Sequence, residues 1–167
     1  MRILPRTRPR LALMVVGVTL AGCASAPGPI VQSFGDFKPP PGTAHYLACP
    51  VNYCVRPVDA ETPILPLNAD KMRAVVRKVI DAQPRTTLIE SQNEGLKLRY
   101  QQRSSVFGFT DTVTIDIVDV SEDESGIAIY SQSDAGSQDF GANHKRVDDW
   151  FVAIEIAVRE ATTKQPG

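Results

Sequence analysis

Three cysteines, Cys23, Cys49 and Cys54, are the residues whose chemistry the sequence indicates most directly. Cys23 ends the stretch Leu20-Ala21-Gly22-Cys23, which follows four arginines and the apolar run from Leu11 to Leu20. A basic start, a short apolar run and small residues are typical of a secretory signal. The run is shorter than the roughly 20 residues that cross a bilayer as a helix. A cysteine directly after Leu-Ala-Gly is typical of a bacterial lipobox, in which its sulfur receives a lipid.

Acylation of Cys23 divides the chain into a signal peptide over residues 1–22, a tether over 23–44 and one domain over 45–167. The mature chain has 14 basic against 19 acidic residues, a formal charge of −5. This mild acidity argues against a nucleic-acid partner and against broad attraction to anionic lipid. We therefore expect the lipid on Cys23 to attach the protein to the membrane. Ala24 directly after the cysteine favours the outer membrane, with the domain facing the periplasm.

Cys49 and Cys54 can pair with each other in an envelope compartment, because that space is oxidising. Such a small loop would stabilise the fold by about 2 kcal/mol. Two alternatives are free thiols and a metal site in which His45 and His144 join the two cysteines, since zinc accepts this ligand set. The spacing matches no standard zinc finger, so the sequence favours the disulfide, with no metal and no cofactor.

The spacing of apolar residues along the chain predicts the helices and strands that carry these residues. Residues 24–44 are rich in proline and glycine and predict an extended tether, and residues 45–68 predict irregular chain fastened by the cysteine pair. A helical pattern begins after Asn68 and ends at Gln83-Pro84, with a basic outer face that is either solvated or a docking surface. Strand patterns follow at residues 86–90, 96–101, 113–117 and 127–130, and a last helix at 143–162. This predicts an α+β fold, a four-stranded antiparallel sheet packed against two helices on one face, in the order helix, four strands, helix.

The connection from the last strand to the last helix is dense in polar residues. In one interpretation it is structural: Asp139 or Asn143 caps the helix, and Gly136 and Gly141 supply positive φ or close packing. In the other, the helix start and the cationic triplet from His144 to Arg146 form a cradle for a carboxylate or phosphate.

Two phenylalanines, Phe107 and Phe109, flank a glycine in the connection between the second and third predicted strands. They either pack beneath the end of the sheet or line an apolar pocket or partner contact.

Several of these segments resemble the family known as domain of unknown function 1499. The likeness rests on Phe107-Gly108-Phe109-Thr110-Asp111, on Gly136, on the run from Asp139 to Val147, and on the cysteine element from Cys49 to Val55. The chain departs from the family pattern at Asp134, where an arginine is usual, and at Thr112, where a second acid is usual. The resemblance implies an envelope lipoprotein and brings no settled activity.

Catalytic chemistry has little support in the sequence. Asp111 and Asp139 could act as paired carboxylates of a weak hydrolase of an envelope polymer, which would need one raised pKa. An ion pair between Asp139 and Arg146 is the simpler expectation. We therefore expect a non-catalytic binding or structural module, with an envelope protein as its candidate partner. The candidate residues lie in the two loops: Phe107, Phe109, Asp111, Gly136, Asp139, Gly141, Asn143 and Arg146.

Overall fold

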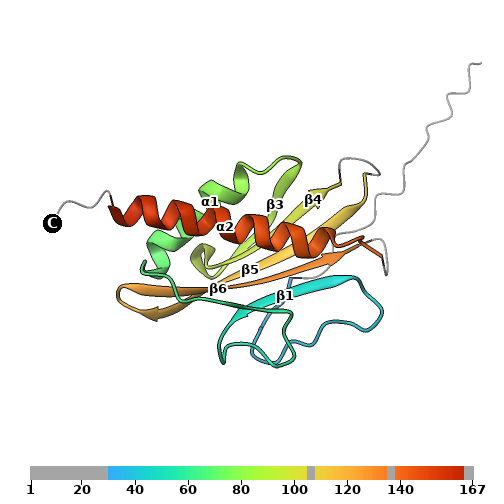
Figure 1. Cartoon of the computed structure of the whole chain (residues 1–167), viewed down its shortest axis with the longest axis horizontal. Helices are drawn as coiled ribbons and strands as arrows, with labels where there is room; N and C mark the ends of the chain where they lie inside the picture. The colour runs from blue at the N-terminus through green and yellow to red at the C-terminus, as the bar shows by residue number, and fades with distance from the viewer. Residues whose placement is uncertain (1–29, 105–107, 135–137, 164–167) are drawn as a thin grey trace, which may run out of the picture.

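The computed structural model describes residues 30–104, 108–134 and 138–163. Six strands form one mixed sheet in the order β2-β1-β6-β5-β4-β3 (Figure 1). Two helices and one short 3-10 turn complete the domain. The elements are β1 His45–Pro50, β2 Ala60–Thr62, α1 Ala69–Asp81, β3 Thr86–Gln92, η1 Asn93–Gly95, β4 Lys97–Arg103, β5 Thr110–Ser121, β6 Glu124–Ser133 and α2 Ala142–Thr163.

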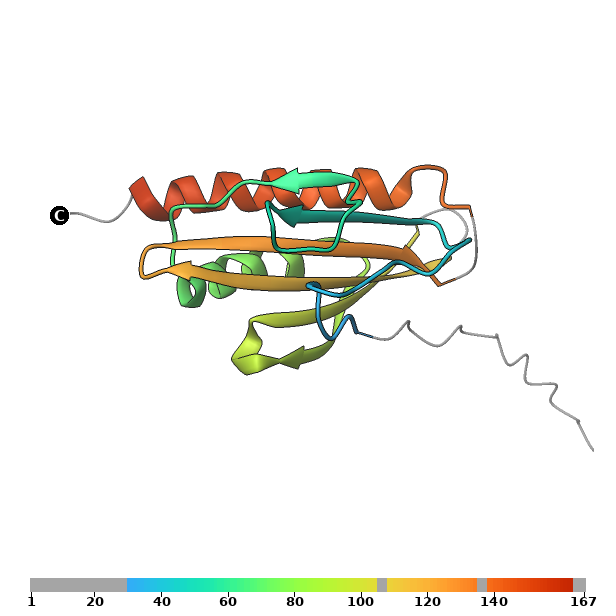
Figure 2. The ribbon, with the colours of Figure 1, turned by 90° about the horizontal axis from the view of Figure 1, so that it is seen from below.

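Both helices pack on one side of the sheet and bury the main core there (Figures 1 and 2). Asn68 caps α1 by accepting a hydrogen bond from the Lys71 N–H at 3.0 Å. Trp150 lies at the centre of the α2 contact, with its ring edge-on to Tyr100 on β4. The apolar faces of α1 and α2 therefore point to the same side, as their periodicity predicted. They are made by Met72, Val76, Ile80, Val147, Trp150, Ile154 and Val158.

The α+β class and its two helices are confirmed, and β3 to β6 contain the four predicted strands. The prediction of a four-stranded antiparallel sheet, and of a helix as the first element, was wrong. Two strands precede α1, and β1 pairs parallel with β2 and antiparallel with β6. β1 gives no alternating pattern, because Leu47 and Cys49 are buried on one face and Ala48 on the other. β2 has only three residues and gives no periodicity.

The second face of the sheet is covered by residues 30–37, which lie within the segment predicted as a tether. Val31 and Phe34 are buried there against Leu47, Ala128 and Tyr130 of β1 and β6. The apolar residues of this segment therefore belong to a second, smaller core. Among the described residues, no helix is long and apolar enough to cross a membrane.

Candidate functional site

A cluster of buried polar side chains lies where the start of α2 meets the ends of β4, β5 and β6. Its centre is Arg146, in the second turn of α2, whose side chain is only 6 % exposed. Alternation along β5 and β6 turns Asp111, Ser131 and Ser133 towards the helices. We call this group the Arg146 cluster: Gln102, Asp111, Ser131, Ser133, Asn143 and Arg146.

Every nitrogen of the Arg146 guanidinium has a partner. Nε donates to Gln102 Oε1 at 2.5 Å, and Nη1 donates to Ser131 Oγ at 2.7 Å and to Asn143 Oδ1 at 2.8 Å. Nη2 pairs with the Asp111 carboxylate. The fork of a guanidinium thus joins three strands to one helix.

The Asp111 carboxylate is bonded on both oxygens, because Ser133 Oγ donates to Oδ1 at 2.9 Å while Arg146 holds Oδ2. Asn143, which is also fully buried, donates from Nδ2 to the Ala44 carbonyl at 3.1 Å and so adds the entrance of β1. When a buried ion pair makes all its hydrogen bonds, removing one partner leaves an unpaired buried charge and lowers the stability of the fold. The geometry therefore fits a structural tie between elements.

Asp139 has a separate role at the start of α2. Its carboxylate accepts hydrogen bonds from the backbone N–H groups of Gly141 at 3.1 Å and Asn143 at 2.9 Å. Burial raises the pKa of the Asp139 carboxyl, and these backbone donors lower it by more, so the net shift is downward. The structure thus selects Asp139 as the cap, with Gly141 at φ 78°. The expected Asp139–Arg146 ion pair was wrong, since Arg146 turns inward to Asp111.

The cationic triplet does not converge on one point. His144 stacks on Tyr46 with ring centroids 4.5 Å apart and bonds Asp148 at 2.9 Å, and Lys145 pairs with Asp149 at 2.7 Å. Both pairs lie on the exposed surface of α2, whereas Arg146 is buried. The side chains proposed for an anion cradle therefore have other partners.

Two large apolar side chains are exposed among the described residues of the two loops. Phe109 is 51 % exposed before β5, and Phe140 is 89 % exposed immediately before Gly141. Phe140 was not among the predicted site residues, although its position between Asp139 and Gly141 is typical of a turn. Phe107, Gly136 and Cys23 lie outside the described residues.

A second buried ion pair, missed from the sequence, lies on the opposite face of the sheet. Lys97 Nζ bonds Asp116 Oδ2 at 2.9 Å and the carbonyls of Val31 and Gln32 at 3.3 and 3.0 Å, and lies 5.5 Å from the centre of the Phe34 ring. Lys97 and Asp116 alternate with apolar residues along β4 and β5, a pattern typical of a sheet with one solvated face. Residues 30–37 cover it instead.

Tyr53, which lies in the loop between Cys49 and Cys54, contacts this second ion pair. Its hydroxyl donates to Asp116 Oδ2 at 2.8 Å, and burial, together with this bond, raises the pKa of the phenol. The hydroxyl therefore stays protonated and serves as a donor. Through Tyr53 the loop is fastened to the buried pair of Lys97 and Asp116.

Cys49 and Cys54 form a disulfide, which confirms the predicted pairing. The bond removes both thiols from the alternative metal site. His45 Nδ1 donates to the Thr43 carbonyl at 2.8 Å, while His144 lies against Tyr46. Among the described residues, no group of histidine, cysteine, aspartate and glutamate is arranged to hold a metal ion.

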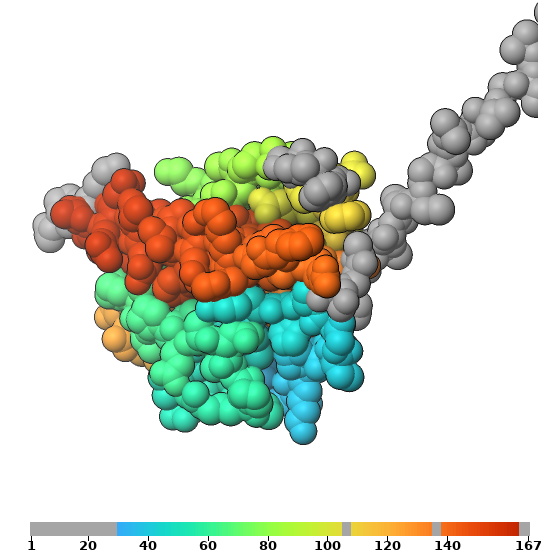
Figure 3. Space-filling view, turned by 45° about the vertical axis from the view of Figure 1, so that its right-hand side comes forward, coloured from blue at the N-terminus to red at the C-terminus, as the bar shows by residue number. Residues whose placement is uncertain are grey.

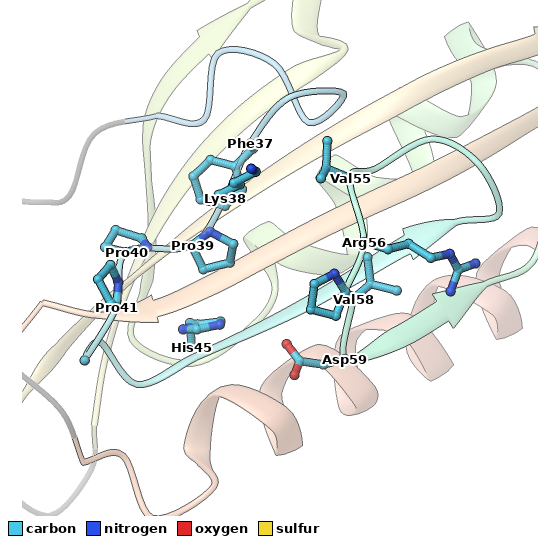
Figure 4. Close-up of a pocket in the computed structure, with 12 residues that line it drawn as sticks. Phe37, Lys38, Pro39, Pro40, Pro41, His45, Val55, Arg56, Val58 and Asp59 are labelled. Atoms are coloured by element: carbon cyan, nitrogen blue, oxygen red, sulfur yellow. The ribbon is translucent and has the colours of Figure 1, made fainter.

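A hollow of about 450 Å³ lies between the Phe37–Gly42 turn and the residues before β2 (Figure 4). Its walls are mainly proline, valine and the Phe37 ring. Its charged groups are largely engaged, because Asp59 accepts a hydrogen bond from the Leu47 N–H at 2.7 Å and Arg56 pairs with Glu61. The hollow can receive an apolar group, and its described lining residues offer no serine, threonine or cysteine as a nucleophile.

The fold and these two buried ion pairs define an α+β protein with a mixed sheet, two helices on one face and residues 30–37 covering the other. A family model described as "Protein of unknown function (DUF1499)" matches residues 20–154, and the chain belongs to this family. The resemblance found in the sequence is thereby confirmed. A search of curated proteins found no match.

Thr112 and Asp134, at which the sequence differs from the pattern that the resemblance implied, are in contact. Thr112 Oγ1 donates to the Asp134 carboxylate, at 2.8 and 2.9 Å from its two oxygens.

Proposed function

We propose that this protein is a lipid-anchored protein of the bacterial cell envelope, whose domain acts as a non-catalytic binding or structural module. The lipobox-like stretch ending at Cys23 supports the anchor, and Ala24 supports the outer membrane, with the domain in the periplasm. The disulfide between Cys49 and Cys54 supports this location, because such bonds persist in oxidising compartments.

One observation carries the non-catalytic part of the proposal: the buried, fully bonded pair of Asp111 and Arg146. These were the charged residues of the two loops best suited to bind or transform a polar ligand. Both are engaged within the domain, so the loops present Phe109 and Phe140 to the outside. Exposed aromatic side chains of this kind are suited to binding a partner through apolar contacts.

The alternative, a hydrolase of an envelope polymer using Asp111 and Asp139, has less support. Such an enzyme needs one carboxyl with a raised pKa to donate a proton. The pKa of Asp139 is lowered by the helix start, and Asp111 already has partners on both oxygens. We therefore favour the binding module.

The anchor is tested with labelled palmitate and with the variant Cys23→Ser. We expect label and membrane sedimentation in the parent and neither in the variant; equal size and equal sedimentation of the two would contradict the proposal. The non-catalytic role is tested with Asp139→Asn. Turnover of an envelope polymer by the parent, lost in a variant that is fully folded at the assay temperature, would contradict it.

A further inference from the structure

Phe140 occupies an unfavourable position for an isolated domain. Its side chain is 89 % exposed, and its backbone is left-handed, with φ 52°. Bulky residues rarely adopt this conformation, and glycine would hold it at lower cost. An exposed aromatic ring kept in a strained backbone points to a contact outside the domain.

Phe109 lies at the same end of the sheet. Its N–H donates to Ser104 Oγ at 3.1 Å, and its carbonyl accepts a hydrogen bond from the Ser104 N–H at 2.8 Å, which closes the connection between β4 and β5. The bond from Arg146 to Gln102 joins this end of β4 to α2. Figure 3 shows the yellow end of this connection beside the orange start of α2. The two phenylalanines therefore belong to one surface, the aromatic end.

The two ends of the sheet differ in charge. The hairpin between β5 and β6, at the far end, is acidic and exposed. Arg85 and Arg103 are exposed beside the aromatic end, where Arg85 Nε donates to the Arg103 carbonyl at 3.1 Å. Asp134 and Asp139 also lie at the aromatic end, which therefore carries both signs of charge, so a negatively charged surface would repel the hairpin more strongly than the aromatic end. The exposed acids of the hairpin are Asp119, Glu122, Asp123 and Glu124.

The described chain begins on the face of the sheet that is opposite the helices. Ile30, the first described residue, lines a hollow that reaches Ser133 and Asp134 at the end of β6, and Val31 bonds Thr114 in the middle of β5. Cys23 precedes Ile30 by seven positions. At about 3.5 Å per residue this stretch spans at most about 25 Å. A lipid on Cys23 would therefore keep Ile30 within that distance of the bilayer, with the aromatic end of the same sheet nearby.

We infer that the aromatic end docks on the bilayer that holds the lipid of Cys23, with Phe109 and Phe140 in the membrane interface. This inference rests on the proposed anchor. Aromatic side chains favour the interface, and Arg85 and Arg103 face anionic headgroups there. The acidic hairpin points away into solvent.

The test uses the full lipid-modified chain in vesicles of equal parts phosphatidylethanolamine and phosphatidylglycerol with brominated acyl chains. Tryptophan replaces one residue at a time: Phe109→Trp, Phe140→Trp and, as a matched control, Val120→Trp. Val120 is 47 % exposed and lies near the far end of β5. The native Trp150 is buried, and the parent protein supplies its signal for subtraction.

We expect flotation of all four proteins with the vesicles. We also expect a blue shift and bromine quenching for tryptophan at positions 109 and 140, and neither at 120. Flotation without quenching at 109 and 140 overturns the docking alone and leaves the anchor standing. A blue shift without quenching also overturns it, and indicates a second copy or protein partner. Failure of the parent to float, with no lipid on Cys23 by mass spectrometry, overturns the anchor and the docking with it.

Discussion

Asp111 and Arg146 lie 35 positions apart in the sequence and form the buried ion pair that joins β5 to α2. Their side chains are 5 % and 6 % exposed, so removing one partner leaves the other as a buried charge. The same pair positions both loops at the aromatic end, because β5 begins next to Phe109 and α2 begins next to Phe140. Its energetics can therefore be measured separately from any binding at the surface.

The variant Arg146→Ala should lose about 3–5 kcal/mol of unfolding free energy, because it leaves a buried carboxylate without its partner. The neighbouring variant Lys145→Ala breaks only an exposed ion pair and should change stability by about 0.5 kcal/mol. Urea unfolding of both measures the difference. The double variant Asp111→Leu/Arg146→Met should recover part of the loss. Equal unfolding midpoints for Arg146→Ala and Lys145→Ala would contradict this role.

The variant Lys97→Met should loosen residues 30–37 from the sheet. It keeps the aliphatic stem and removes the charge that bonds Asp116 and two carbonyls of that segment. Hydrogen exchange of a peptide covering residues 30–37 should become faster, as should its proteolysis. Lys71→Met, on the exposed side of α1, is the matched control and should leave this exchange unchanged. Slow exchange in Lys97→Met would show that apolar contacts alone hold the segment.

Periodicity was sufficient for the helices and for the strands that have one buried face. Met72, Val76 and Ile80 repeat along α1, and Val113, Ile115 and Ile117 alternate along β5. It was insufficient for β1, because Leu47, Ala48 and Cys49 are buried in succession against two different cores. A strand buried on both faces is hard to recognise from its own residues.

The sequence located the loops of the site and misassigned the partners within it. Capping by Asp139 is local, within four residues, and was predictable from residue type. The partner of Arg146 depends on how β5 meets α2, which local patterns do not contain. The pair of Lys97 and Asp116 was missed for the same reason, since its cover comes from Val31 and Phe34 far earlier in the chain.

Reduction of the disulfide should lower stability moderately. The bond closes a short loop between Cys49 and Cys54, for which loop closure predicts about 2 kcal/mol. Thermal unfolding with and without reductant measures the effect. The double variant Cys49→Ser/Cys54→Ser should melt at the temperature of the reduced parent and be insensitive to reductant. Two free thiols in protein purified from the envelope would contradict the pairing.

Lowering the pH should remove the stability that the charged Asp139 carboxylate contributes at the start of α2. The pKa of its carboxyl lies below the ordinary value of 3.8, because backbone N–H groups hold the charged form. A carboxyl with a lower pKa in the folded state adds stability that is complete above the unfolded pKa and is lost as pH falls through the folded pKa. Asp139→Asn should therefore be less stable than the parent by about 0.5 kcal/mol at neutral pH.

This difference should shrink as the pH falls below 3.8, the ordinary value for the group. Unfolding by urea at a series of pH values measures it. Asp123→Asn, in the exposed hairpin, is the control for loss of a negative charge away from a helix start. A difference for Asp139→Asn that does not vary with pH would show that the amide fails to cap for steric reasons.

Replacing Phe140 with glycine should separate stability from membrane contact. Glycine adopts φ 52° without steric cost, so Phe140→Gly should gain about 1 kcal/mol of unfolding free energy if strain outweighs the added freedom of the unfolded chain. The ring is 89 % exposed, so its removal costs little packing in the free domain. Urea unfolding measures the gain, and Phe140→Ala, which keeps the strain, is the matched control and should show none. If glycine destabilises the domain as much as alanine does, the ring packs within the domain and is not held outward for an external contact.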